Sequence, residues 1–298
     1  MHTKRILQAI SIVTAGYCPI AAICLYSGVD VPATRVVGIL FDLPFARIGS
    51  STVGTRQYYT ELQAVKHLPV DNPLDATSPR ERVWNKIVDE YALRELALQY
   101  KISATNDDLA RYYEAFFGDS VAAPDRASVL QSEYGTTVAY FKQHILSTLL
   151  LRDRIRQYLI THEPTPELLH MKSFYEIVQG DPTRFEAETQ SYYKDNGGAP
   201  TDTDILLSSS DITDDFAFVK KISVNGISPI VASSDGYRVY KLRNHFTDSA
   251  TEAWQLTEFY IPVDLLSPLL VKERHDITIV QYAPLLINKK NATKVPSS

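Results

Sequence analysis

The histidines are the residues of this chain most able to carry acid–base or metal chemistry, yet none stands at a metal-binding spacing. No His-Glu-x-x-His or i, i+4 pair joins any of the seven. Five of them, in the second half of the helical region and beyond, are His144, His162, His170, His245 and His275. The sequence therefore predicts neither a bound metal ion nor another cofactor.

Nucleophilic and nucleotide-binding motifs are also absent. The sequence has no Gly-x-Ser-x-Gly turn, no phosphate-binding loop and no dinucleotide fingerprint. Both cysteines, Cys18 and Cys24, lie in the first apolar segment. The rest of the chain consequently has no thiol for a disulfide, a thiolate zinc site or a cysteine nucleophile.

Length and charge narrow the class of protein further. A chain of 298 residues with 45% hydrophobic residues is long enough for about two domains, each with a core. Its net charge is −5, so the chain lacks the excess of Lys and Arg that contacts with nucleic-acid phosphates need. We therefore expect no nucleic-acid partner.

The N-terminal segment has the composition of a membrane anchor. No charged residue lies between Ile6 and Val29, a length close to the roughly 20 residues of a transmembrane helix. Lys4 and Arg5 precede it, which favours a cytoplasmic N-terminus. A cleaved signal peptide and a buried core helix are the alternatives. The sequence favours a single-pass cell-membrane protein whose soluble part lies on the extracytoplasmic side.

The middle of the chain is predicted to be mostly helical. Ser78, Pro79 and Glu81 form a helix start, and apolar residues then recur at helical spacing to about residue 100. Thr105 is a second capping residue. A short strand over Phe45–Ile48 and a long helix after Thr136 complete this part.

The C-terminal half mixes helices with strands. Helices are expected at about 165–178, 181–194 and 212–223. Strands are expected at 228–232, 237–243, 255–261 and 277–282, and a short helix at about 264–272. This alternation predicts a small α+β unit.

The order of these pieces resembles one family, the extracytoplasmic parvulin-type prolyl isomerase chaperones of the SurA and PrsA kind. The run LPFARIGSSTVGTRQYYTELQ, from residue 43, is similar to the family's strand-turn-helix start. The run LRELALQYKISATNDDL, from residue 93, and the step from Tyr134-Gly135 to Phe141 resemble its helical part. The run GISPIVASSDGY, residues 226–237, is similar to the signature of the parvulin domain.

The resemblance also implies site residues. Asp195, Ser233 and Arg238 match positions of the family's catalytic site, while Ile212, Phe216 and Tyr237 match substrate-binding positions. Arg238 replaces a histidine of the family, and no histidine-bearing strand precedes the helix at 165. A fixed cation replaces a neutral imidazole, so the resemblance implies weak or lost isomerase activity.

These features predict an α+β protein with a transmembrane anchor at 1–30 and a helical, SurA N-terminal-like domain at 31–163. A divergent parvulin-like domain at 164–246, a strand-helix-strand segment at 247–287 and a tail at 288–298 follow. The function implied is a membrane-anchored folding factor that binds unfolded or partly folded polypeptides. An isomerase with altered chemistry, a non-catalytic holdase and a structural or assembly subunit with one specific partner remain alternatives. A helical cradle of exposed aromatic side chains would hold the clients, and its residues are Tyr58, Tyr59, Tyr112, Tyr113, Phe116 and Phe117.

Overall fold

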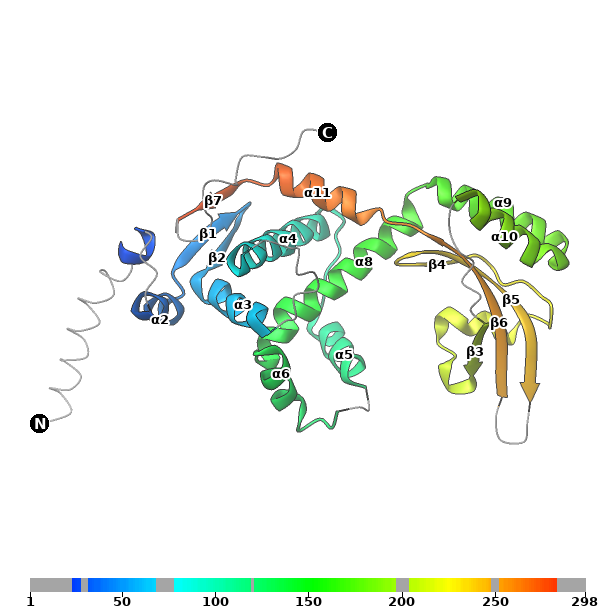
Figure 1. Cartoon of the computed structure of the whole chain (residues 1–298), viewed down its shortest axis with the longest axis horizontal. Coiled ribbons are helices and arrows are strands. Elements are labelled where there is room, and N and C mark those ends of the chain that lie inside the picture. The colour runs from blue at the N-terminus through cyan, green and yellow to red at the C-terminus, as the bar shows by residue number, and fades with distance from the viewer. Residues whose placement is uncertain are drawn as a thin grey trace, which may run out of the picture. The chain divides into compact units, whose positions relative to one another are not determined.

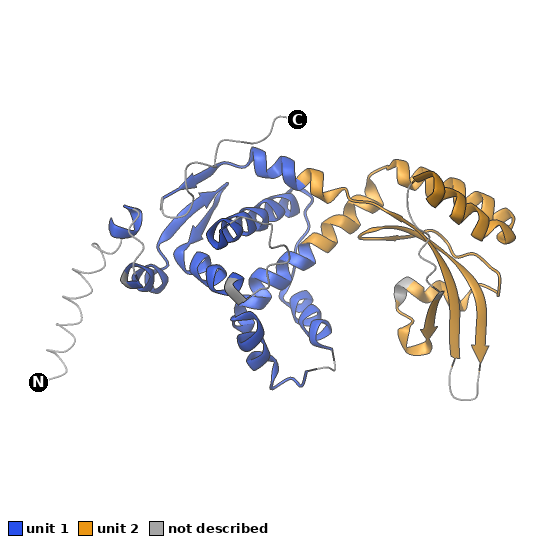
Figure 2. Ribbon diagram, in the orientation of Figure 1, with its two compact units in different colours: residues 1–151, 270–298 blue, residues 152–269 orange. Residues whose placement is uncertain are grey.

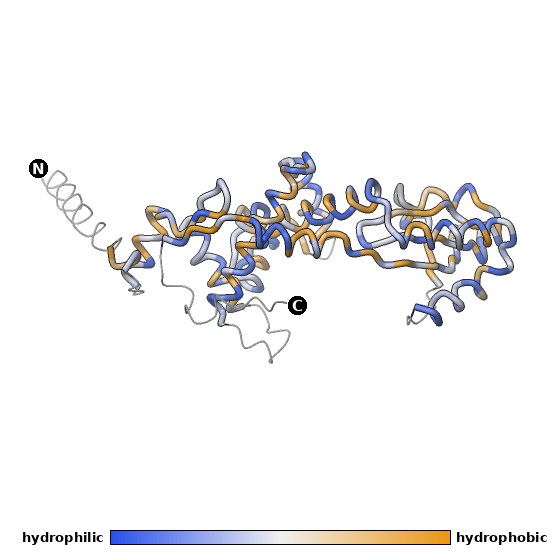
Figure 3. Tube along the Cα trace, turned by 90° about the horizontal axis from the view of Figure 1, so that it is seen from above, coloured by the Kyte–Doolittle hydropathy of each residue, from blue (hydrophilic) through white to orange (hydrophobic). Residues whose placement is uncertain are grey.

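The computed structural model describes residues 23–27, 32–67, 78–118, 121–196, 204–247 and 252–282. The chain is α+β and divides into two compact units (Figure 2): unit 1 is residues 1–151 and 270–298, and unit 2 is residues 152–269. Hydrophilic and hydrophobic residues are interspersed along the described part of the chain (Figure 3). Unit 2 is thus inserted, in sequence, between the two parts of unit 1.

The prediction of a transmembrane helix, and with it of a single-pass membrane protein, has to be corrected. Among the described residues, no helix combines the length and apolar character that crossing a membrane requires. Residues 1–22 and 28–31 of the predicted anchor lie outside that description. In the described part, Leu25 is fully buried, and Tyr26 packs against the unit 1 core and donates to the Pro44 carbonyl at 3.0 Å. This end of the segment therefore belongs to the folded unit.

Unit 1 combines helices with a small sheet (Figure 1). Its helical elements are α2 (Pro32–Phe41), α3 (Thr55–His67), α4 (Pro79–Gln99), α5 (Asn106–Phe117), α6 (Arg126–Tyr134), α7 (Val138–Tyr140) and the π-helix η1 (Phe141–Leu146). Its strands, in sheet order, are β2 (Ser51–Gly54), β1 (Pro44–Ile48) and β7 (Ile279–Gln281), and both pairings are antiparallel. Two helices, α8 (Ser147–His162) and α11 (Leu266–Asp276), carry the chain from one unit to the other.

The predicted helix starts are confirmed. The Glu81 backbone N–H donates to Ser78 Oγ at 3.2 Å, and Thr105 forms a reciprocal capping box with Asp108. The buried face of α4 then packs against β1, β2 and α3 around Trp84, while a second core surrounds Phe141. These cores hold α4, α5 and η1 in place.

Unit 2 is built on a four-stranded antiparallel sheet. The strands, in spatial order, are β3 (Asp204–Ser208), β6 (Glu252–Pro262), β5 (Gly236–Thr247) and β4 (Val231–Ser233). The helical elements are α9 (Pro166–Gly180), η2 (Pro182–Arg184), α10 (Phe185–Asn196), η3 (Ser209–Asp211) and η4 (Asp214–Lys220). Strands β3, β4 and β5 thus lie in one sheet with β6, which pairs with both β3 and β5. β6 comes from residues 247–287, which were predicted to form a separate segment.

The two faces of this sheet have separate cores. On one face Tyr237, Val239 and Phe259 pack against α9 and α10. On the other face Tyr240, Leu242 and Trp254 pack against the segment containing η4. Since neighbouring residues of a strand point to opposite faces, Tyr237 and Arg238 belong to different surfaces.

Candidate functional site

Arg238 is the centre of a polar cluster on the η4 face of the unit 2 sheet. Its Nη1 and Nη2 donate to the two carboxylate oxygens of Asp235 at 2.6 and 2.7 Å, and its Nε donates to Glu258 at 3.0 Å. The guanidinium carbon lies 4.1 Å from the centre of the Tyr260 ring. All three guanidinium nitrogens therefore have partners: two form a bidentate pair with Asp235, and the third binds Glu258.

The ionisation of this cluster favours fixed charges over proton transfer. The hydrogen bonds from Arg238 hold the pKa of Asp235 well below its usual range, and the same bonds raise the pKa of Arg238. Ser233 Oγ lies 2.8 Å from Asp235 Oδ1 and also contacts Arg238. Because Asp235 stays ionised and accepts these hydrogen bonds, it is poorly suited to give or take a proton near neutral pH.

The predicted apolar pocket residues lie on this same face. Ile212 and Phe216 are partly buried against the core that contains Tyr240. The Phe216 ring lies 5.6 Å from the Tyr240 ring and 6.1 Å from that of Phe218, so the three rings pack on one another. Burial, followed by the nearby Glu258 carboxylate, raises the pKa of Tyr240 and keeps its hydroxyl neutral.

The remaining predicted site residues lie elsewhere. Asp195 is exposed near the end of α10 and lines a cavity of about 290 Å³ with His170 and Tyr192. Tyr237 is 1% exposed, and its hydroxyl donates to the Ile160 carbonyl at 2.9 Å. Because α10 and Tyr237 belong to the opposite core, the six residues do not converge. The structure joins Ser233 with Arg238 and places Ile212 and Phe216 on their face.

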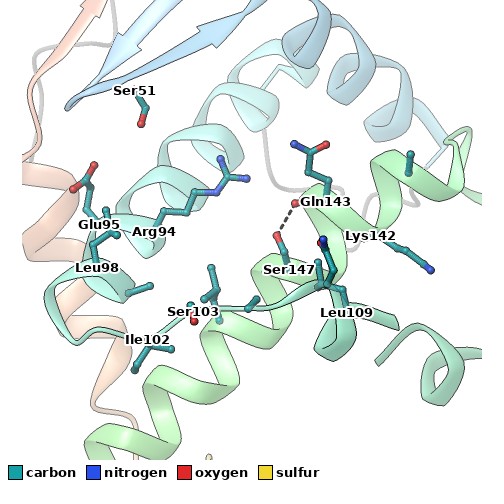
Figure 4. Close-up of a pocket in the computed structure, with 15 residues that line it drawn as sticks. Ser51, Arg94, Glu95, Leu98, Ile102, Ser103, Leu109, Lys142, Gln143 and Ser147 are labelled. Atoms are coloured by element: carbon teal, nitrogen blue, oxygen red, sulfur yellow. Dashed lines mark hydrogen bonds between the residues drawn. The ribbon is translucent and has the colours of Figure 1, made fainter. Parts of the chain in front are cut away.

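A larger cavity lies in unit 1. It measures about 640 Å³ and is lined by α4, the loop before α5, α5, α7, η1 and the start of α8, with Ser51 of β2 (Figure 4). Its apolar residues are Ala97, Leu98, Ile102, Ala104, Leu109, Ala139 and Leu151. Among its polar residues, Arg94 and Lys142 are cationic and Glu95 is anionic. The cavity therefore has apolar walls with a few charged groups, as binding cavities commonly do.

This cavity was not predicted from the sequence. The predicted aromatic cradle is wrong for Tyr58, Tyr59, Tyr113 and Phe117, which are at most 6% exposed because they fill the unit 1 cores. Leu98 is instead 70% exposed and lines the cavity. It follows Trp84 and Tyr91 at steps of seven along α4, so the apolar stripe continues beyond the residues that the fold buries. That continuation was the available signal.

No protein-family model matches the sequence, and no curated protein matches it either. The resemblance to parvulin-type chaperones stays a prediction that depends on the motifs quoted above.

Proposed function

We propose that the protein is a polypeptide-binding folding factor that holds apolar segments of unfolded chains in the unit 1 cavity, with weak or no prolyl isomerase activity. The observation that carries this proposal is the cavity itself. A holdase needs an apolar concavity on its helical part, and here Leu98 lines such a concavity while 70% exposed. An exposed leucine in an apolar recess is a surface that gains from being covered.

The size of the expected contacts suits reversible binding. Burying apolar surface contributes about 25 cal/mol per Å² to binding. Covering a leucine side chain completely therefore contributes roughly 1.5 to 3 kcal/mol. Much of that gain is offset by ordering the bound segment. No nucleotide-binding motif is present in the sequence to drive release, so weak contacts of this size are what a reversible holding function requires.

The Arg238 cluster supports the second part of the proposal. The barrier to peptide-bond rotation is about 18–20 kcal/mol, and a catalyst must favour the twisted amide through placed dipoles beside an apolar slot. Here the guanidinium donors of Arg238 bind Asp235 and Glu258, and Phe216 packs on Tyr240. The Arg238 donors are therefore occupied by carboxylates, and the Phe216 ring packs on a neighbouring ring instead of lining an open slot for proline.

The test is suppression of aggregation of a chemically reduced client by the full chain at stoichiometric amounts. Leu98→Asp places a charge in the cavity, and Leu169→Asp is its matched control on α9, since Leu169 is 64% exposed. We expect the wild type and Leu169→Asp to suppress aggregation and Leu98→Asp to lose about tenfold or more in client affinity. A protease-coupled peptide assay of the same samples should show little or no acceleration of prolyl isomerisation.

Two results would contradict the proposal. If the wild type leaves the client aggregating at the uninhibited rate, the holding function is refuted. If Leu169→Asp weakens binding as much as Leu98→Asp does, binding is not in the cavity.

A further inference from the structure

A cluster of possible metal ligands lies inside unit 1, formed by Glu61 on α3, Glu90 on α4 and His144 on η1. One ligand atom of each lies within 4.8 Å of the other two. The carboxylates belong to buried residues, 1% exposed for Glu61 and 2% for Glu90, and His144 Nδ1 lies 3.0 Å from Glu90 Oε1. Three separate elements thus bring two carboxylates and an imidazole together.

Local structure around His144 supports a role beyond packing. His144 lies in a π-helix, a rare conformation that occurs frequently at functional sites. The ring of Tyr140 stacks on the imidazole at 4.5 Å. An aromatic ring thus covers one face of the imidazole.

Both carboxylates already pair with a cation, but the cations leave one carboxylate oxygen without a hydrogen-bond partner. Lys86 donates to Glu61 Oε1 and Arg94 donates to Glu90 Oε1, each at 2.5 Å. Glu90 Oε2, in contrast, is buried and has no hydrogen-bond partner among the described residues. A buried carboxylate oxygen without a donor is costly, and a bound cation would supply the missing partner.

We propose that Glu61, Glu90 and His144 bind one divalent first-row transition metal ion, with Zn²⁺ as the reference case. Imidazole and carboxylate are the donors that Zn²⁺ takes, at about 2.0–2.2 Å. Tetrahedral ligands at that distance lie about 3.4 Å apart. His144 Nδ1 and Glu90 Oε1 are already 3.0 Å apart, and a Glu61 oxygen lies within 4.8 Å of the other two ligand atoms. Lys86 and Arg94 are the competing cations, and their side chains, 38% and 32% exposed, have room to turn toward solvent. Arg94, which pairs with Glu90, also lines the unit 1 cavity (Figure 4).

The test is calorimetric titration of the chelator-treated full chain with Zn²⁺ alone. We expect one saturable site in the wild type. Glu90→Gln and His144→Ala should each weaken binding by at least about tenfold, since loss of even an outer-shell partner of a metal site costs roughly 10- to 100-fold in affinity. His162→Ala removes an exposed histidine and is the matched control, for which we expect unchanged binding.

Lys86→Met separates a metal site from a purely structural ion-pair network. Removing a competing cation should tighten Zn²⁺ binding several-fold, whereas a network without a metal function would bind no Zn²⁺ in any variant. Circular dichroism checks folding, and if Glu90→Gln fails to fold, His144→Ala and Lys86→Met still decide the question. No saturable binding by the wild type, or equal losses in His144→Ala and His162→Ala, would overturn the proposal.

Discussion

Replacing Arg238 by methionine should destabilise unit 2 far more than replacing an ordinary surface arginine. The Arg238 side chain is 19% exposed and Glu258 is 14% exposed, so the substitution leaves Glu258 as a largely buried carboxylate without its cation. The half-exposed pair with Asp235 and the contact with the Tyr260 ring are lost as well. Breaking a buried pair costs about 3–5 kcal/mol, and we reduce this to about 2–4 kcal/mol because Asp235 is solvent-screened.

The chain contains its own reporters for this measurement. Its two tryptophans are divided between the units: Trp84 is buried in unit 1 and Trp254 in unit 2. In a Trp84→Phe background, urea unfolding followed by fluorescence reports the unit 2 transition alone. The control is Arg184→Met, which removes a 53% exposed arginine paired with Glu188 in the next turn. We expect that control to cost less than about 0.5 kcal/mol.

Coupling between the charges gives the refuting result. In the double variant Arg238→Met/Glu258→Gln the unpaired buried charge is gone, so the loss of stability should be smaller than in Arg238→Met alone. Equal losses for Arg238→Met and Arg184→Met in the unit 2 transition would show that the Arg238 cluster is not a stabilising element.

Two further predictions concern the same cluster. Hydrogen bonds from Arg238 lower the pKa of Asp235 in the folded state, so this group contributes stability above its unfolded pKa of about 4. That contribution is lost as pH falls below about 4, and acid unfolding of Asp235→Asn, followed through Trp254, should lack this part of the pH dependence. Separately, Arg238→His restores the histidine of the resembled family, yet we expect prolyl isomerisation to stay near the uncatalysed rate because Asp195 lies with the other core. Family-like rates in the peptide assay would contradict this.

Local features of the fold could be predicted from the sequence because they depend on near neighbours. The Ser78 and Thr105 caps and the buried face of α4 follow from spacings of three to seven residues. The position of β6 in the sheet, in contrast, cannot be predicted from such short spacings. It pairs with both β5 and β3, and its place in the centre of the sheet depends on contacts between distant segments. β3 itself is a short strand next to polar residues and has no clear periodic signal.

The candidate sites show the same division. The contact of Arg238 with Asp235 follows from the short turn between β4 and β5, but its contact with Glu258 requires the pairing of β5 with β6. Glu61, Glu90 and His144 stand at no motif spacing, since each comes from a different helical element. Only packing of α3, α4 and η1 brings them together, so motif analysis of the sequence predicted no metal site.

The alternation of side chains along β5 gives the neighbouring residues Tyr237 and Arg238 different roles. Gly236 has a φ of +155°, and a Cβ there would clash with the Ile261 carbonyl oxygen, so the pairing with β6 requires glycine. Tyr237 then points into the core under α9 and α10, where its hydroxyl bonds to the Ile160 carbonyl. Both residues serve the fold of unit 2. Arg238, on the other face, binds Asp235 and Glu258, which makes that face an ion-pair network and leaves the unit 1 cavity as the better candidate for binding polypeptides.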